Sequence, residues 1–89
     1  MITLGMLQEK MHKLKNWAIE EDSIVKDKLF RNFKEALEFV NKVGEIAERE
    51  KHYPSVIISE GNVRMSLTTS EEKGVSEKDF AVAEEIDKI

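Results

Sequence analysis

Residues 55–68, SVIISEGNVRMSLT, decide the fold, because they have the pattern of two short strands joined by a tight turn. Apolar side chains alternate with others on both sides of Gly61-Asn62, a dipeptide typical of two-residue hairpin loops. A loop at these two residues sets three pairs opposite one another: Glu60 with Val63, Ile58 with Met65, and Val56 with Leu67. Because apolar residues then face apolar residues, we predict an antiparallel hairpin in this register.

The segment before this hairpin has the pattern of an amphipathic helix. Asn32 is a good N-cap, and Glu35 three residues later completes a capping-box arrangement. Apolar residues then recur at helical spacing: Phe33, Ala36, Leu37, Val40, Val43 and Ala47, widened by Phe39 and Ile46. The pattern ends in the charged stretch 48–51, and Pro54 prevents the helix from continuing.

Two further helices are expected near the ends of the chain. The last begins at the N-cap Ser76, and Asp79 completes a second capping box. Its buried face is formed by Val82, Ala83, Ile86 and Ile89. The first begins at Thr3, carries one narrow apolar stripe, and is expected to end near Asn16.

The region between the first and second helices has the pattern of two strands. Residues 17–20 alternate, and residues 21–23 supply turn chemistry. Residues 24–31 fit a twisted or edge strand better than a helix. The order α-β-β-α-β-β-α predicts an α+β fold, a four-stranded antiparallel sheet with three helices packed on one face.

The composition limits the classes of protein to which the chain can belong. Its 89 residues suffice for a single domain, 1–89, and its 14 basic and 18 acidic side chains give a net charge of −4. An acidic chain without a basic stripe argues against direct nucleic-acid binding. The longest apolar run, 56–58, is too short to span a membrane, and no secretory signal is visible. We therefore expect a cytoplasmic protein.

The stretch EREKHYP before the hairpin contains the side chains best suited to chemistry. Glu48 and His52 are four positions apart, so on a last helical turn the carboxylate can orient the imidazole. The predicted register, extended backwards, places Tyr53 opposite Ser70, and Asp79 follows in the first turn of the last helix. These groups could serve general acid–base chemistry. The same pattern is also typical of solvated ion pairs and helix caps.

A metal site is not expected, because the chain has no cysteine and its two histidines, His12 and His52, are far apart. Glycine-rich phosphate loops, dinucleotide-binding fingerprints and nucleophile elbows are absent from the sequence. Composition and spacing alone therefore predict no more than a small α+β domain.

Several spacings occur together along nearly the whole chain: Trp17, Phe30-x-x-Phe33-x-x-Ala36-x-x-Phe39, Ala47-Glu48, His52-Tyr53-Pro54, 63–69, Gly74-Val75-Ser76-Glu77-Lys78-Asp79 and Ala83. Together they resemble the pterin-4a-carbinolamine dehydratase family. The resemblance implies the same α+β fold, in chains that pair their sheets edge to edge into dimers and often tetramers.

The resemblance also implies a reaction. Members of the family remove water from a 4a-hydroxytetrahydropterin, which gives the quinonoid dihydropterin during recycling of the tetrahydropterin used by aromatic amino acid hydroxylases. The reaction requires no metal and no other cofactor. The signature is matched in part: Glu48, His52, Pro54 and Asp79 are present, whereas Tyr53 and Ser70 stand where the family has histidines.

The site that this resemblance implies has a catalytic part and a substrate-binding part. His52 is expected to be the general acid/base, with Glu48 orienting it and Asp79 as the third catalytic residue. The pterin is expected to contact Tyr53, Pro54, Thr69 and Ser70. The expected partners are this small-molecule pterin and further copies of the chain, joined as a dimer or tetramer through sheet edges or helices.

The replacement of two signature histidines leaves a second class of function open. The chain could be a non-catalytic or altered-ligand relative, acting as a pterin-binding module or as an oligomerisation or partner-binding module. The family offers a precedent, since its animal members also act as dimerisation cofactors of a homeodomain transcription factor.

Overall fold

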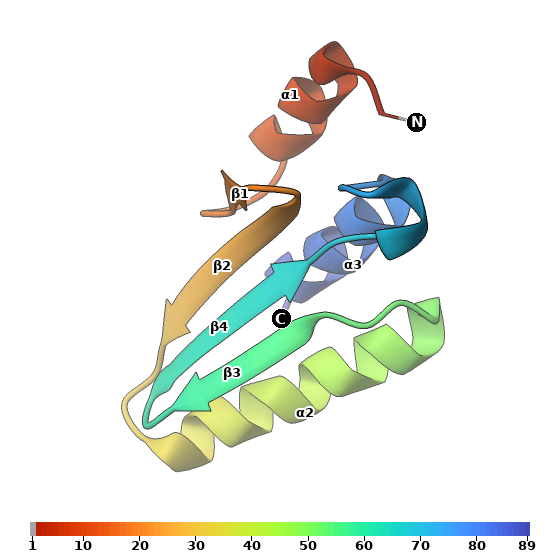
Figure 1. Cartoon of the computed structure of the whole chain (residues 1–89). Helices are drawn as coiled ribbons and strands as arrows, with labels where there is room; N and C mark the ends of the chain where they lie inside the picture. The colour runs from red at the N-terminus through yellow and green to blue at the C-terminus, as the bar shows by residue number, and fades with distance from the viewer. Residues whose placement is uncertain (1) are drawn as a thin grey trace.

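The computed structural model describes residues 2–89 and has the predicted order of helices and strands (Figure 1). The elements are α1 (Leu4–His12), β1 (Ala18–Glu20), β2 (Ser23–Leu29), α2 (Phe33–Glu50), β3 (Ser55–Ser59), β4 (Asn62–Leu67), the short 3₁₀ helix η1 (Ser70–Glu72) and α3 (Glu77–Asp87). The predicted α+β class is therefore confirmed, and only η1 lies outside the expectations. No helix within the described residues is long and apolar enough to cross a membrane.

The four strands are ordered β1-β2-β4-β3, and every neighbouring pair is antiparallel. Residues 24–29 form a strand as predicted. Of the two predicted alternatives, a twisted or an edge strand, the edge strand is wrong, because β2 pairs with β1 on one side and β4 on the other. The first part of β2 has three consecutive buried residues, Ile24, Val25 and Lys26, as expected of an interior strand. The edges of the sheet are β1 and β3.

The β3–β4 hairpin forms, but its register differs from the prediction by two residues. Ser59 pairs with Asn62, so the turn consists of Glu60 and Gly61. Glu60 takes the left-handed conformation (φ 54°), and a Cβ on Gly61 would lie 2.4 Å from the carbonyl oxygen of Phe30. The turn is therefore positioned by a contact with the end of β2. A shift by two residues keeps the apolar side chains on the same face of the sheet.

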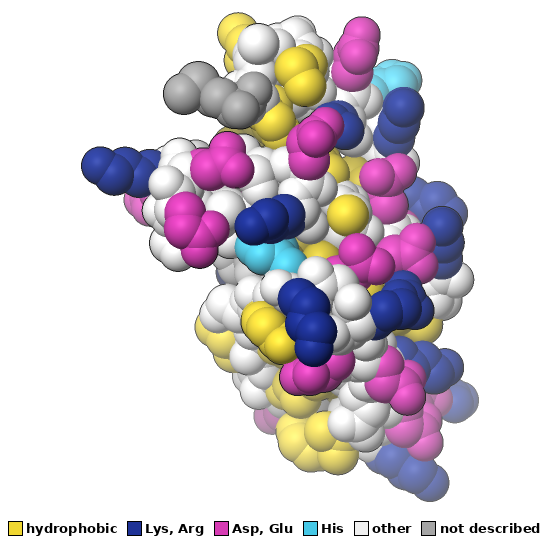
Figure 2. Space-filling view, turned by 90° about the vertical axis from the view of Figure 1, so that its right-hand side faces the viewer, with side chains coloured by type: hydrophobic (Ala, Val, Ile, Leu, Met, Phe, Trp, Pro, Cys, Tyr) yellow, Lys and Arg dark blue, Asp and Glu magenta, His cyan; other side chains and the backbone are white. Residues whose placement is uncertain are grey.

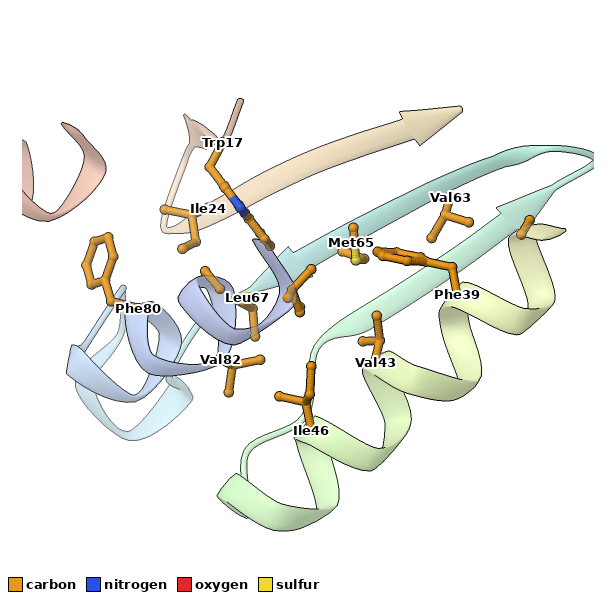
Figure 3. Packing of buried hydrophobic residues seen from close by; sticks show 13 residues of the cluster. Trp17, Ile24, Phe39, Val43, Ile46, Val63, Met65, Leu67, Phe80 and Val82 are labelled. Atoms are coloured by element: carbon orange, nitrogen blue, oxygen red, sulfur yellow. The ribbon is translucent and has the colours of Figure 1, made fainter. Parts of the chain in front are cut away.

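The helices pack on one face of the sheet, and the hydrophobic core lies between them (Figures 1 and 3). Figure 3 shows Phe39, Val43 and Ile46 pointing from α2 toward the strands. The buried cluster consists of Trp17, Ile24, Ala36, Phe39, Val43, Ile46, Val63, Met65, Leu67, Phe80, Val82, Ala83 and Ile86. Helix α1 has no buried residue, but Leu7 and Met11 pack against this cluster with one side.

Helix α1 is shorter than predicted. It begins after the N-cap Thr3 but ends at His12, whereas the sequence predicts an end near Asn16. Residues 13 and 14 form i→i+3 backbone hydrogen bonds, and Asn16 has a left-handed φ of 63°. This reversal directs the following residue, Trp17, into the core.

The two predicted capping boxes have different outcomes. In α3 the box is complete, with Ser76 and Asp79 each bonding the other's backbone N–H. In α2, Asn32 accepts a hydrogen bond from the N–H of Glu35, as predicted. The Glu35 carboxylate instead accepts hydrogen bonds from the backbone N–H and guanidinium of Arg31, so the capping box predicted for α2 is not formed.

A buried ion pair attaches the end of α3 to the sheet. Lys26 points to the core face of β2, and its Nζ lies 2.7 Å from Oδ1 of Asp87. The side chains of both residues are more than nine-tenths buried. Asp87 also accepts hydrogen bonds from the Trp17 indole and from the backbone N–H of Lys15, each at 2.9 Å. This cluster joins α3, β2 and the segment after α1.

Candidate active site

The end of α2 determines where His52 lies. Lys51 takes the left-handed conformation (φ 57°, ψ 36°), which ends the helix, and the N–H of His52 donates to the carbonyl oxygen of Ala47 at 3.2 Å. Residues in this conformation turn the chain away from the helix axis. His52 therefore follows the helix instead of continuing the face that carries Glu48, and its side chain is directed toward α3.

The partner of the imidazole is Asp79, in the first turn of α3. Nε2 of His52 lies 2.5 Å from Oδ1 of Asp79. The Asp79 carboxylate is fully buried, and the His52 side chain is 14% exposed. Among residues 2–89 no hydrogen bond joins His52 to Glu48, which is exposed on α2. The carboxylate that bonds the imidazole is thus Asp79, 27 positions away along the chain, and not the predicted Glu48.

The other oxygen of Asp79 is held by two groups from the same end of the sheet. Oδ2 accepts hydrogen bonds from the Thr69 hydroxyl and from the Ser76 N–H, each at 2.8 Å. The Thr69 and Ser76 hydroxyls are 2.6 Å apart. The N-terminus of a helix favours a negative charge, because its free N–H groups point outward there. The capping box of α3 therefore also presents a carboxylate to the imidazole.

Three other predicted residues line a groove to which no member of this polar cluster contributes. Glu48, Tyr53 and Pro54 border a groove of about 640 Å³ between α2 and β3. The remaining lining residues are mainly apolar or small: Val40, Asn41, Val43, Gly44, Glu45, Ala47 and Val56. His52 is not among the lining residues, but it is the chain neighbour of Tyr53. An apolar groove that has a phenol and a carboxylate at its border is suited to a flat, polar-edged ring.

The last two predicted residues are placed differently from one another. Thr69 is only 2% exposed, and its hydroxyl is used by Asp79 and Ser76. Ser70 is exposed at the start of η1. The predicted register set Ser70 opposite Tyr53, whereas the observed register, extended in the same way, sets Thr69 opposite His52. The predicted residues thus form a buried polar cluster, a groove wall and one separate exposed serine.

One member of the cluster, Ser76, is absent from the predicted site. Sequence patterning identified Ser76 as a helix N-cap, and that role accounts for its residue type. Its contact with Thr69 comes from two segments seven residues apart that meet where Thr69 bridges to Gly74. An N-cap serine next to a predicted catalytic aspartate is the signal that could have identified it.

The face of the molecule drawn in Figure 2 carries intermingled acidic and basic side chains, with a histidine between them near its centre. No group of three or more histidine and carboxylate side chains among residues 2–89 is arranged to hold a metal ion.

Comparison with known proteins identifies similar chains over the full length of the fold. The sequence profile of the family described as "Pterin 4 alpha carbinolamine dehydratase" matches residues 2–89. A Nostoc punctiforme protein named "Putative pterin-4-alpha-carbinolamine dehydratase" is 37% identical, over 100% of this chain and 96% of its own length. A Sulfurisphaera tokodaii protein with the same name is 37% identical, over 99% and 95%.

A solved structure has the same fold. The crystal structure of a transcriptional coactivator/pterin dehydratase from Brucella melitensis superposes with a TM-score of 0.92 and 25% sequence identity. The match covers 98% of this chain and 95% of that one.

Proposed function

Because the chain belongs to the pterin-4a-carbinolamine dehydratase family, we propose that it removes water from a 4a-hydroxytetrahydropterin and releases the quinonoid dihydropterin. The observation that carries this proposal is the contact between His52 and the buried Asp79, because Tyr53, the chain neighbour of His52, lines an apolar groove. A pterin is a flat bicyclic ring with polar edges, and such a groove fits a ring of that kind. Recycling of a tetrahydropterin is the role we propose for the reaction.

The reaction needs two proton transfers. The C4a–O bond breaks as the departing hydroxyl receives a proton and leaves as water, and the adjacent ring nitrogen loses a proton as the C4a=N bond forms. Imidazolium can deliver the first proton, and the resulting neutral imidazole can take up the second. In this proposal His52 does both, so the enzyme ends in the protonation state in which it began. Asp79 stabilises the imidazolium through the hydrogen bond to Nε2.

The remaining site residues take roles that follow from their positions. Glu48, Tyr53 and Pro54 are proposed to contact the pterin, because they line the groove. Tyr53 is 57% exposed, and its phenol can donate a hydrogen bond to the ring. Ser70 does not line the groove and is exposed, so the role proposed for its hydroxyl is limited to holding a water.

The test measures the rate at which a synthetic 4a-hydroxytetrahydropterin is dehydrated. Rapid-mixing experiments compare the wild type with His52→Gln. Loss of a general acid/base typically costs 10²–10⁴-fold in rate, so we expect a decrease of about that size. The matched control is His12→Gln, because the chain has two histidines and His12 is exposed on α1. A folded His52→Gln protein with the wild-type rate would overturn the proposal.

A second candidate function follows from the histidines that the signature lacks. Tyr53 and Ser70 replace them, so a pterin-binding module without turnover is the alternative. Titration with a dihydropterin, monitored by pterin fluorescence, distinguishes the two functions. If the wild type binds the dihydropterin without turning over the carbinolamine, and His52→Gln binds it equally well, the pterin-binding module is favoured. No binding at millimolar pterin favours a partner-binding module.

We also propose that the chain associates with further copies of itself in the cytoplasm. The edge strand β3 exposes Ile57, which is 60% accessible, and α2 exposes Phe33 and Leu37. Open strand edges and apolar side chains on a small protein favour pairing. Sedimentation equilibrium should give a mass that is a multiple of 10.3 kDa, and Ile57→Lys should lower it if the sheet edge is the contact.

A further inference from the structure

We propose that the Thr69–Ser76–Asp79 cluster fixes His52 as the tautomer with its proton on Nε2, and that Nδ1 is the atom that exchanges protons with the substrate. The inference concerns the same site and, in its second half, rests on the proposed dehydratase function. It assigns Thr69 and Ser76, which do not face the groove, as positioning residues.

The hydrogen bonds in the cluster all run in one direction. The backbone N–H of Lys78 donates to Oγ of Ser76 at 3.3 Å. Thr69 donates its hydroxyl proton to Oδ2 of Asp79 at 2.8 Å, so in the 2.6 Å contact between the two hydroxyls Ser76 must be the donor. Each hydroxyl has a single proton, so it can donate to only one acceptor. The chain therefore ends on Asp79 with every proton directed toward the carboxylate.

This direction determines which ring nitrogen of His52 carries the proton. Oδ2 of Asp79 accepts from Thr69 and from the Ser76 N–H, and Oδ1 faces only Nε2 of His52. An ionised carboxylate can only accept hydrogen bonds, so Nε2 must be the donor. In the neutral ring the lone pair is then on Nδ1. A reversed chain would require Thr69 or Ser76 to lose its partner in a buried site, which costs free energy.

The accessibility of the ring leads to the same atom. Among residues 2–89, no group hydrogen-bonds Nδ1 of His52. No buried side-chain nitrogen or oxygen in that range lacks a hydrogen-bond partner. Nδ1 therefore reaches solvent, although the side chain as a whole is only 14% exposed. Nε2 is occupied by a fully buried carboxylate, so only Nδ1 can meet a molecule that arrives from outside.

Thr69 acts on this arrangement through Asp79. It is 2% exposed and bonds no residue of the groove. Thr69→Val keeps the shape of the side chain but removes the donor to Oδ2, whereas Thr69→Ser keeps the donor. A purely structural role would be disturbed by both changes to a similar degree. A positioning role is disturbed by valine and retained by serine.

The experiment is ¹⁵N NMR of the full chain labelled at histidine, at a pH where the rings are neutral, with His52→Gln used to assign the two ring systems. We expect His52 to have a protonated Nε2 and an unprotonated Nδ1, and His12 to show the exchanging average of a free ring. In Thr69→Val the His52 signals should move toward that average, and kcat should fall about tenfold with little change in KM. In Thr69→Ser the His52 signals and kcat should stay close to those of the wild type.

The outcomes separate this inference from the dehydratase proposal. A protonated Nδ1 in the wild type overturns the inference and leaves the dehydratase proposal standing. The expected tautomer in a protein whose rate is unaffected by His52→Gln overturns the dehydratase proposal and leaves only the tautomer assignment. The wild-type spectrum decides the tautomer even if Thr69→Val does not fold.

Discussion

Nε2 of His52 lies 2.5 Å from Oδ1 of Asp79, although 27 positions separate the two residues along the chain. The contact joins the segment after α2 to the first turn of α3. Asp79 is thus at once a helix-capping residue and the buried partner of the His52 imidazole, and Tyr53, the chain neighbour of His52, lines the groove. The same hydrogen bonds that begin α3 therefore position the imidazole.

Removal of the Asp79 carboxylate should strongly destabilise the protein. Asp79→Ala leaves the Thr69 hydroxyl, the Ser76 N–H and the His52 ring without their acceptor in a buried site. Breaking a buried charged contact typically costs about 3–5 kcal/mol. Urea unfolding followed by circular dichroism measures the change. Glu77→Ala is the control, because Glu77 is an exposed acid in the same turn, and a loss below about 1 kcal/mol is expected. Equal losses in the two variants would contradict this account.

The buried pair of Lys26 and Asp87 should show strong coupling. Asp87→Ala leaves the Lys26 ammonium in the core and removes the acceptor of the Trp17 indole N–H. We expect a loss of about 3–5 kcal/mol for Asp87→Ala. The double variant Lys26→Met/Asp87→Ala should lose less than the sum of the single changes, by about 0.5–3 kcal/mol.

Trp17 provides the probe for this double-mutant cycle, because it is the chain's one tryptophan and its indole bonds Asp87. Unfolding in urea, followed by its fluorescence, gives all four free energies. Strict additivity of the two single changes would show that the pair is not coupled, contrary to its geometry.

Two glycine substitutions should have opposite effects. Gly61→Ala places a Cβ 2.4 Å from the backbone oxygen of Phe30, so the hairpin turn or the end of β2 must move. Overpacking of this kind typically costs about 1–3 kcal/mol. Gly44→Ala meets nothing within 4 Å and lies inside α2, where alanine is favoured by about 0.5–1 kcal/mol. Thermal unfolding should therefore shift downward for Gly61→Ala and upward for Gly44→Ala. A stabilising Gly61→Ala would contradict the close contact.

The contrast between these glycines shows where sequence patterning succeeds. The hairpin, its two strands and the face they bury follow from alternation, because the period of a strand is local. The position of the turn does not, since Gly61 is required by the backbone of Phe30, at the end of another strand. Gly61-Asn62 and Glu60-Gly61 preserve the same alternation, so sequence alone cannot separate them.

The same limit applies to the candidate site. The capping box of Ser76 and Asp79 is a local pattern, and it was predicted correctly. The partner of His52 was not, because the helical spacing from Glu48 holds only if the helix continues through residue 52. Lys51 in the left-handed conformation ends it at Glu50, two residues before His52, and lysine carries no signal for that conformation. The contact with Asp79 then depends on how α3 docks on the sheet.

The ion pair at the start of α2 should give a pH-dependent stability. The hydrogen bond from the Arg31 guanidinium holds the pKa of Glu35 below its ordinary value of 4.5. A carboxyl whose pKa is lower in the folded state contributes stability above its unfolded pKa, and that contribution disappears as the pH falls through the folded value. Glu35→Gln removes the charge at nearly constant size. The melting temperature of the wild type should therefore exceed that of Glu35→Gln by a small amount at neutral pH.

The difference between the two proteins should close as the pH is lowered below about 4.5, and it should shrink in molar salt, because exposed ion pairs are screened. Differential scanning calorimetry across this range measures it. Glu38→Gln is the control, since Glu38 is exposed on the same helix and forms no ion pair among residues 2–89. A difference that persists unchanged to strongly acidic pH would mean that the charge of Glu35 contributes nothing. The effect of Glu35 would then come from hydrogen bonds that glutamine does not form at this position.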